Sequence, residues 1–279
     1  MNLVIENQLI TLADLRAVWE EATTVSLGQG ARRRIAEANE LIDEVVAQGD
    51  LVYGVNTGFG QMAQVRIDDE ELVHLQENLV RSHSVGVGED LDDDIVRLIM
   101  VCKLAALAEG YSGVRLELVE MLCAMINNNI YPRIPSRGSV GASGDLAPLA
   151  HMAGALIGIG EVRVNSNLVP TPIALKNAGI ESIRLAPKEG LALLNGTQVS
   201  TALAFAGLFE SQRCFDAAIV AGALSVDAAM GSDTPFDSRI HEIRNHQGQM
   251  DCARMYRELL AGSQIRDSHR ECSRVQDPY

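Results

Sequence analysis

Residues 138–150 (GSVGASGDLAPLA) are the most unusual stretch of the sequence. Three glycines at a spacing of three leave its backbone open to close approach by other groups. Asp145 follows the glycines and can cap a helix, in which Pro148 is tolerated because it falls in the first turn. The pattern fits a glycine-rich turn into a helix, or a phosphate cradle at a helix N-terminus. A phosphate cradle is disfavoured, because no Lys-Ser/Thr pair follows and no suitable strand precedes.

A third interpretation is covalent self-processing of Ala142, Ser143 and Gly144. In a tightly bent loop the amide nitrogen of Gly144 can attack the carbonyl carbon of Ala142, because Ala and Gly place almost nothing in its path. Loss of two waters, one of them from the Ser143 hydroxyl, then leaves a conjugated ring with an exposed methylidene carbon. No standard side chain supplies such an electrophile, so the segment predicts a prosthetic group that the chain makes itself.

The elements that must position this segment are mostly helices, as the spacing of their apolar residues predicts. Helical periodicity is present in five segments: residues 11–21, 31–48, 68–79, 95–106 and 114–127. Thr11 with Asp14 predicts a capping box, and Gly49 is a usual helix stop. The acidic run 89–94 is expected to lie solvated at a helix N-terminus. The only strand-like stretch is 161–169, which predicts a β-hairpin.

One helix is expected to be unusually long and apolar. Residues 197–230 are apolar almost all round, with a polar patch only near 210–213. A helix that is apolar on every side is buried, so this one is predicted to run through the centre of a bundle or an oligomer interface. The composition, 47% hydrophobic but only 4% aromatic, also favours a helical protein over a β-sandwich. The predicted fold class is mainly α.

Charge and cysteine content argue against several classes of protein. With 37 acidic and 23 basic residues the formal charge is −14, so nucleic acid is not an expected partner. Five cysteines without a C-x-x-C pair argue against a disulfide framework and a cysteine zinc site. The N-terminus does not have the pattern of a signal peptide, and no apolar run is long enough to span a bilayer. We expect a cytoplasmic chain without membrane contact.

No metal site is predicted either. Five histidines are scattered without metal-ligand spacing and are interpreted as structural: His74, His151, His241, His246 and His269.

Five further segments accompany the motif GASGDLAPLA of residues 141–150: residues 53–60 (YGVNTGFG), 78–84 (NLVRSHS), 188–197 (KEGLALLNGT), 245–249 (NHQGQ) and 275–279 (VQDPY). Over the whole chain the sequence resembles the histidine and aromatic amino-acid ammonia-lyases and aminomutases. The prosthetic group of that family, 4-methylideneimidazole-5-one (MIO), is made from an Ala-Ser-Gly triad, which here is Ala142-Ser143-Gly144. The resemblance implies a fold of the fumarase/aspartase type, with an MIO-bearing N-terminal domain over 1–196 and the start of a central long-helix bundle over 197–279.

The resemblance also implies roles for residues that have ordinary structural explanations. It makes Tyr53 the base that removes the substrate's β-proton, although a half-buried core tyrosine fits the sequence as well. It makes Asn195 a contact of MIO and of the substrate's carboxyl end, which is compatible with a plain turn or a helix N-cap at Asn195-Gly196. The pair Ser82-His83 matches histidine lyases and some tyrosine aminomutases, which implies substrate contact by His83, whereas a lone histidine is more often structural.

Three more residues complete the implied site. Gly60 and Gln276 match substrate-binding positions of the family, and Tyr279 matches a second active-site tyrosine. Family chains continue beyond that tyrosine with an Arg that binds the substrate carboxylate, a Glu and further long helices, so the sequence resembles the N-terminal portion of a lyase. Members of the family assemble as homotetramers whose active sites take residues from more than one subunit.

The reaction that the resemblance implies is non-oxidative deamination of L-histidine to trans-urocanate and ammonia. The same residues are compatible with a tyrosine or phenylalanine ammonia-lyase, or with a 2,3-aminomutase, which returns the amine to the β-carbon. A further alternative is a catalytically silent lyase fragment, because the expected C-terminal Arg and helices do not occur in the sequence.

Overall fold

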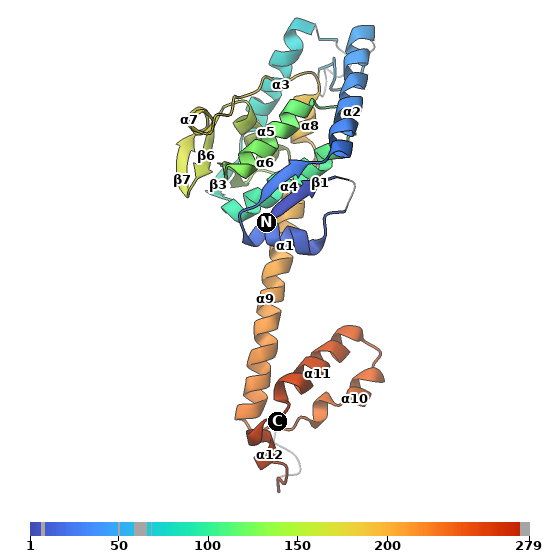
Figure 1. The fold of residues 1–279 in the computed structure, drawn as a ribbon, viewed down its shortest axis with the longest axis vertical. Coiled ribbons are helices and arrows are strands. Elements are labelled where there is room, and N and C mark those ends of the chain that lie inside the picture. The colour runs from blue at the N-terminus through green and yellow to red at the C-terminus, as the bar shows by residue number, and fades with distance from the viewer. Residues whose placement is uncertain (7–8, 50, 59–65, 68, 274–279) are drawn as a thin grey trace. The chain divides into compact units, whose positions relative to one another are not determined.

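The structure is a computed structural model that describes residues 1–6, 9–49, 51–58, 66–67 and 69–273 (Figure 1). The chain divides into two compact units, Met1–Ala206 and Gly207–Tyr279. Helices account for most of the described residues, which confirms the mainly α class predicted from the sequence. None of the helices in this described part is long and apolar enough to cross a membrane.

The first unit is built mainly from helices. They are α1 (Leu12–Glu20), α2 (Gln29–Gln48), α3 (Asp69–His83), α4 (Asp93–Ala108), α5 (Leu116–Asn127), α6 (Leu146–Leu156), α7 (Thr171–Asn177), α8 (Glu189–Leu194) and the beginning of α9 (Gln198–Ala228). α4 packs against α1, α2 and α5, while α3, α6 and α8 pack against one another. These last three helices come from distant parts of the sequence, and each begins or ends at a segment with a predicted site residue.

Several helix ends follow local signals in the sequence. Thr11 caps α1 in a capping box, since its hydroxyl accepts the Asp14 N–H at 3.2 Å and the Asp14 carboxylate accepts the Thr11 N–H at 2.9 Å. Gly49 ends α2 in the left-handed conformation, with φ +76°. The helix predicted to start at Asp68 is α3, but Asp68 itself lies outside the described residues.

The helical periodicity of residues 95–106 predicts one apolar face with Ile95, Leu98, Ile99, Cys102 and Ala106, which α4 confirms only in part. Leu98 and Ile99 are buried as expected, but Ala106 is exposed and Lys103 is buried. The difference arises because α1, α2 and α5 cover α4 from several directions, so burial does not follow a single stripe.

Short strands make up the remaining regular structure of the first unit: β1 (Asn2–Ile5), β2 (Thr24–Leu27), β3 (Val87–Asp90), β4 (Tyr131–Pro132), β5 (Pro135–Arg137), β6 (Glu161–Val164) and β7 (Asn167–Pro170). β6 and β7 pair antiparallel and confirm the predicted hairpin; Asn165 and Ser166 in its turn have positive φ. The prediction of a single strand-like stretch was wrong, because β1 pairs with β2, β3 with β5, and β4 with β6. Those strands have at most four residues, too few for a clear alternating pattern.

The acidic run 89–94 is divided between two elements. Asp93 and Asp94 lie in the first turn of α4, where the helix dipole favours carboxylates. Asp90 instead ends β3, and its carboxylate pairs with Arg133 at 2.9 Å and with Arg163 at 3.2 Å. The expectation of a wholly solvated run was therefore wrong for Asp90, because the guanidinium groups of Arg133, between β4 and β5, and of Arg163, in β6, lie within reach.

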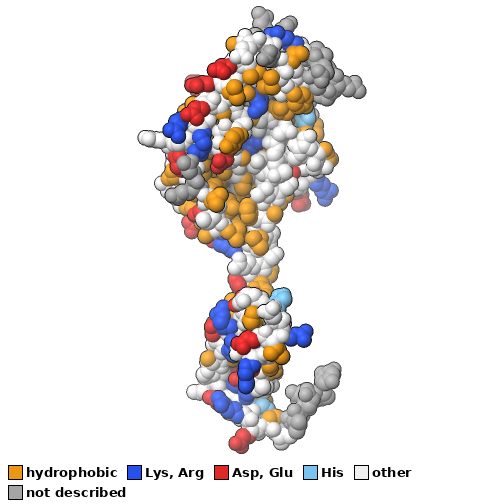
Figure 2. Space-filling model, turned by 90° about the vertical axis from the view of Figure 1, so that its right-hand side faces the viewer, with side chains coloured by type: hydrophobic (Ala, Val, Ile, Leu, Met, Phe, Trp, Pro, Cys, Tyr) orange, Lys and Arg blue, Asp and Glu red, His pale blue; other side chains and the backbone are white. Residues whose placement is uncertain are grey.

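The second unit continues α9 and adds four shorter helices: η2 (Thr234–Phe236), α10 (Ser238–Glu242), α11 (Gln247–Leu260) and α12 (Gln264–Ser268). Tyr256 of α11 stacks on Phe236 with the ring centroids 4.6 Å apart. Within this single chain the long apolar helix is not covered all round, since Phe215 is 46% exposed and Leu224 is 65% exposed, and its place in a bundle or an oligomer interface stays a prediction. The helices of this unit are too short to cover the whole circumference of α9. Figure 2 shows charged side chains of both signs on this unit, and hydrophobic side chains at the surface of the first unit.

Candidate active site

The loop of residues 138–145 connects β5 to α6 and is tightly bent. Gly141, Ser143 and Gly144 all have positive φ, at +71°, +60° and +93°. Such a conformation is uncommon for a residue with a side chain, so Ser143 is the strained member of the three. Ala142 and Ser143 are exposed. The three residues predicted to form a ring therefore lie in a sharp, accessible turn.

Gly144 lies directly against Gly196, the residue that follows Asn195. The two glycines form an isolated parallel β-bridge, and the Asp145 N–H donates to the Gly196 carbonyl oxygen at 2.8 Å. A Cβ atom on Gly144 would lie 2.2 Å from that oxygen, so glycine is required at this close approach. The structure thus brings together two segments that the sequence analysis predicted for one site.

Asp145 ties the loop to the first turn of α9. Its side chain is 2% exposed and accepts hydrogen bonds from the Ser139 hydroxyl at 2.9 Å, the Ser200 hydroxyl at 2.7 Å and the Ser200 N–H at 2.8 Å. Asp145 occupies the N-cap position of α6, but its side chain makes no capping bond there, so the predicted capping role was wrong. The carboxylate instead accepts hydrogen bonds from Ser200 in the first turn of α9. The free N–H groups of that turn and the helix dipole also favour a negative charge there.

A cavity of about 320 Å³ borders this loop. Ser139, Asp145 and Ser200 line it together with Pro148 and Leu203. The carboxylate of Asp145 is engaged by its three donors, so this cavity presents hydroxyl and apolar groups together with the side chain of Arg137.

Asn195 is the C-cap of α8. The alternative that it is the N-cap of the following helix, α9, is therefore wrong. Its main-chain N–H and its side-chain Nδ2 both donate to the Leu191 carbonyl oxygen at 3.0 Å. Its own carbonyl oxygen accepts a hydrogen bond from Lys103 Nζ at 2.9 Å. Asn195 is partly exposed, so these bonds hold the residue without burying it completely.

Lys103 was not predicted to belong to the site. It lies in α4 with only 2% of its side chain exposed, and burial lowers its pKa to about 7. The signal that points to it is a single Lys inside the otherwise apolar run of residues 98–108. Buried lysines are rare because a buried ammonium is costly, so a Lys in such a run indicates a specific partner.

Tyr53 lies on a loop whose following residues are anchored in the core. Asn56 and Thr57 are 1% and 2% exposed; the Asn56 side chain accepts the Val52 N–H at 2.9 Å and the Thr57 hydroxyl accepts the Gly54 N–H at 3.3 Å. The Tyr53 side chain itself is 55% exposed, so the alternative of a half-buried core tyrosine does not hold in this chain. Asn56 and Thr57 anchor the loop in the core, and the phenol of Tyr53 is exposed to solvent.

His83 is the last residue of α3. Its Nδ1 lies 2.9 Å from the Leu79 carbonyl oxygen and 3.1 Å from the Ser82 hydroxyl. A carbonyl oxygen only accepts, so the bond to Leu79 requires a proton on Nδ1. The other ring nitrogen, Nε2, is then the one available to a ligand.

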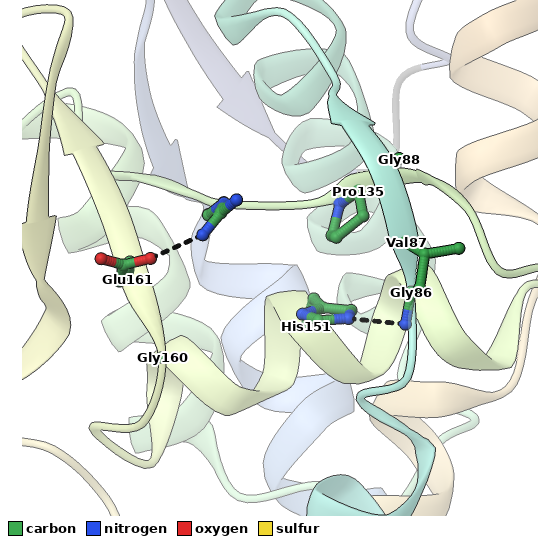
Figure 3. A pocket seen from close by; sticks show the side chains of 8 residues that line it. Gly86, Val87, Gly88, Pro135, His151, Gly160 and Glu161 are labelled. Atoms are coloured by element: carbon green, nitrogen blue, oxygen red, sulfur yellow. Dashed lines mark hydrogen bonds and ion pairs between the residues drawn. The ribbon is translucent and has the colours of Figure 1, made fainter.

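The segment that follows His83 is held by α6. His151 Nε2 accepts the Gly86 N–H at 3.0 Å, and Figure 3 shows the His151 ring directed at that nitrogen. Both residues line a cavity of about 450 Å³ together with Arg133 and Glu161. Burial, and then the positive charge of Arg133, lower the pKa of His151, which favours the neutral ring that can accept. His151 is therefore structural, as predicted, and links α6 to the chain after His83.

The comparison with known proteins agrees with this geometry and with the motifs. Residues 10–279 match the family model described as aromatic amino acid lyase. The chain belongs to the aromatic amino acid lyase family. Within it, the chain is 52% identical over 270 residues to a histidine ammonia-lyase from Legionella pneumophila (strain Corby), a match that covers 97% of this chain and 54% of that protein.

Solved structures of aromatic amino acid lyase relatives have the same fold. Histidine ammonia-lyase from Trypanosoma cruzi superimposes with a TM-score of 0.85 at 35% identity, covering 92% of this chain and 50% of the other. A tyrosine aminomutase from Streptomyces globisporus gives 0.88 at 37% identity, covering 94% and 49%. The ammonia-lyase-like fold implied by the sequence motifs is thereby confirmed. This lyase-family chain spans about half the length of the curated relatives that it matches.

Three of the predicted site residues of this family member, Gly60, Gln276 and Tyr279, lie outside the described residues. Of the others, Gly144 and the Asn195-Gly196 turn are joined directly, while Tyr53 and His83 are presented on separate segments. Within the described ranges, no three His, Cys, Asp or Glu side chains are grouped so as to hold a metal ion.

Proposed function

We propose that this chain carries the MIO-forming part of a histidine ammonia-lyase, which deaminates L-histidine to trans-urocanate and ammonia. The observation that carries the proposal is the sharp turn at Ala142, Ser143 and Gly144, in which Ala142 and Ser143 are exposed, Ser143 and Gly144 have positive φ, and Gly144 is held against Gly196. The identity of 52% to the Legionella pneumophila histidine ammonia-lyase supports the choice of substrate.

The residues present fit the formation of this group. Ring closure joins the Gly144 nitrogen to the Ala142 carbonyl carbon, whose oxygen leaves as water. A second water leaves with the Ser143 hydroxyl and the hydrogen on its Cα. The sharp turn at these three residues and the absence of a Cβ on Gly144 both favour this attack. Once formed, the ring supplies an electrophilic carbon for the amino group of the substrate.

The chain's own side chains then have three roles. Tyr53 removes the β-proton of the substrate through its phenolic oxygen, a role that its exposed position supports. The Asn195 amide contacts the carboxyl end of the substrate, on the turn that backs Gly144. His83 contacts the substrate's imidazole through Nε2, because Nδ1 is engaged by Leu79. Gly60, Gln276 and Tyr279 complete the site as substrate-binding and active-site residues.

We also propose that the chain acts within a homotetramer in the cytoplasm, without a metal ion. The exposed apolar side chains of α9, among them Phe215 and Leu224, support burial against further helices. Functionally, residues 1–196 form the MIO-bearing domain and 197–279 the start of the long-helix bundle. α9 begins two residues after Gly196, which supports this division.

A second candidate is a tyrosine or phenylalanine ammonia-lyase or a 2,3-aminomutase. The aminomutase is favoured among these by the Ser82-His83 pair together with the similarity to the tyrosine aminomutase from Streptomyces globisporus. A chain that is silent by itself is the third candidate, since the match covers 54% of the Legionella pneumophila protein.

The test has two steps. First, the mass of the proteolytic peptide that contains Ala142 to Gly144 is compared with the unmodified mass; we expect a deficit of two waters. Second, the chain is incubated with L-histidine, L-tyrosine and L-phenylalanine, alone and with the C-terminal half of the Legionella pneumophila enzyme. Urocanate from histidine supports the first candidate, a β-amino acid from tyrosine supports an aminomutase, and no turnover in the mixture despite a formed ring contradicts the proposed activity.

A further inference from the structure

Lys103 is unusual among the lysines of the chain. The sequence contains three, at 103, 176 and 188. Lys176 is exposed and Lys188 is partly exposed, whereas Lys103 is 2% exposed in α4, at the core of the first unit. A buried ammonium is unfavourable unless polar groups surround it, so its partners define its role.

Those partners are main-chain carbonyls rather than carboxylates. Lys103 Nζ donates to the Ala192 carbonyl oxygen at 2.7 Å and to the Asn195 carbonyl oxygen at 2.9 Å. Among the described residues no Asp or Glu forms an ion pair with it. Both oxygens belong to the C-terminal end of α8, where carbonyls lack helical donors and the helix dipole is negative. The ammonium thus caps α8 from a neighbouring helix.

The other end of α8 is held by a buried charge of the opposite sign. Glu189, the first residue of the helix, is 0% exposed and accepts the Ala186 N–H at 2.7 Å. Arg115 binds its carboxylate through Nε at 3.0 Å and through Nη2 at 2.8 Å. A negative charge at the N-terminus and a positive one at the C-terminus both match the dipole. A helix of six residues is too short to be stable alone, so these contacts determine where it lies.

The position of the Lys103 ammonium reaches the ring-forming loop through the Asn195–Gly196 peptide unit and Gly196. Its bond to the Asn195 carbonyl fixes the plane of the peptide between Asn195 and Gly196, because that unit is rigid. The nitrogen of this unit belongs to Gly196 and would lie 2.9 Å from a Cβ on Gly144, while the Gly196 carbonyl, in the next unit, accepts the Asp145 N–H. A displaced Asn195 carbonyl therefore displaces the surface against which Gly144 is held.

We propose that Lys103 is a positioning residue that sets the Asn195–Gly196 turn against Gly144, and so controls both ring formation and the placement of the Asn195 amide. The part of this inference that concerns ring formation rests on the proposed function. The effect of Lys103 on the position of the Asn195–Gly196 turn does not depend on any reaction. Lys103 touches neither the ring nor the substrate, and acts through backbone carbonyls.

The test compares Lys103→Met with wild type and with Lys176→Met, a matched control at an exposed lysine. Methionine keeps most of the length and volume of the side chain but removes the donors of Nζ from the two carbonyls. Two quantities are measured in each protein: the fraction of the Ala142-to-Gly144 peptide that has lost two waters, and the hydrogen exchange rate of the Asp145 amide. The Ile159 amide, which bonds to Gly154 at the far end of α6, serves as an internal reference.

In Lys103→Met we expect a lower ring fraction and exchange at Asp145 that is about tenfold faster, with Ile159 unchanged. Lys176→Met should behave as wild type in both measurements. If Lys103→Met does not fold, Lys103→Gln, which keeps two N–H donors without a charge, provides the same test with a smaller expected change.

Two results would overturn the inference: wild-type exchange at Asp145 in a folded Lys103 variant, or equal acceleration at Asp145 and Ile159, which indicates general loss of stability. Absence of the ring in wild type would refute the proposed function instead, while the exchange rates would still decide the role of Lys103.

Discussion

A Cβ atom on Gly144 would lie 2.2 Å from the carbonyl oxygen of Gly196, and the Asp145 N–H donates to that same oxygen at 2.8 Å. The ring-forming loop and the turn after α8 therefore meet through backbone atoms alone. Because no flexible side chain lies between them, a displacement of one segment is passed directly to the other.

Substitution of Gly144 by Ala should prevent ring formation and lower the free energy of unfolding by about 1–3 kcal/mol, because the added methyl group overlaps a backbone oxygen. Gly141→Ala is the matched control: its φ is also positive, at +71°, but no atom lies within 4 Å of the added Cβ. That change should cost about 1 kcal/mol or less and keep the ring. Urea unfolding and peptide mass measure both effects, and equal behaviour of the two variants would contradict the role of the Gly196 contact.

Ser143→Ala should leave the fold intact and abolish the two-water deficit. Ser143 is exposed, so its loss should change the unfolding free energy by no more than about 0.5 kcal/mol. Ser136→Ala, at another exposed serine of the same region, should retain the deficit. Peptide mass spectrometry distinguishes the two, and a dehydrated peptide from Ser143→Ala would exclude Ser143 as the source of the second water.

Tyr53→Phe should keep the ring and lower turnover about 10²–10⁴-fold in an assembly completed with a C-terminal half, because the phenol is the proposed base. Tyr111→Phe removes a hydroxyl from a tyrosine that is 89% exposed and should have no effect. The rate of urocanate formation is the measurement. Normal turnover in Tyr53→Phe would assign the base to another residue.

Burial lowers the pKa of Lys103 from 10.5 to about 7, which makes the stability of the chain depend on pH. Between these two values the unfolded chain binds the proton and the folded chain does not. The free energy of unfolding should therefore rise with pH over this window, by up to about 1.4 kcal/mol per pH unit. Lys103→Met removes this contribution, so the difference between wild type and variant should grow in favour of wild type as pH rises. A difference that is flat from about pH 7 to 10 would show that the ammonium is not desolvated as the structure indicates.

His151 gives a second pH dependence, on the acid side. Burial, followed by the charge of Arg133, lowers its pKa below the usual 6.5, and the opposing influence of Asp90 is smaller. The bond to Gly86 is fully present above pH 6.5 and should be lost as pH falls through the lowered value, because a protonated ring cannot accept. His151→Leu should cost about 1–3 kcal/mol at about pH 8 and less at acid pH, where wild type has already lost the bond. Substitution of the exposed His74 by Leu is the control for the urea unfolding series.

Much of the local structure could be predicted from the sequence. The capping box at Thr11 and Asp14, the stop at Gly49 and the hairpin at Asn165 and Ser166 depend on residues only a few positions apart. Patterns of this range are read directly from the residue types. The motif around Ala142, Ser143 and Gly144 likewise indicates the family through residue types and spacing alone.

Only the tertiary structure decided which partners these residues have. Asp145 has the position of a helix cap, yet its carboxylate binds Ser139 and the first turn of α9, because the Ser200 N–H and hydroxyl of that turn lie within hydrogen-bond distance. Lys103 lies in an apolar run of the sequence. Its hydrogen bond to the Asn195 carbonyl forms only because α4 packs beside the end of α8. The sequence by itself determined the reactive triad and most helices, since those depend on local geometry. Contacts such as Gly144 with Gly196 join segments far apart along the chain, and their formation depends on the packing of whole helices.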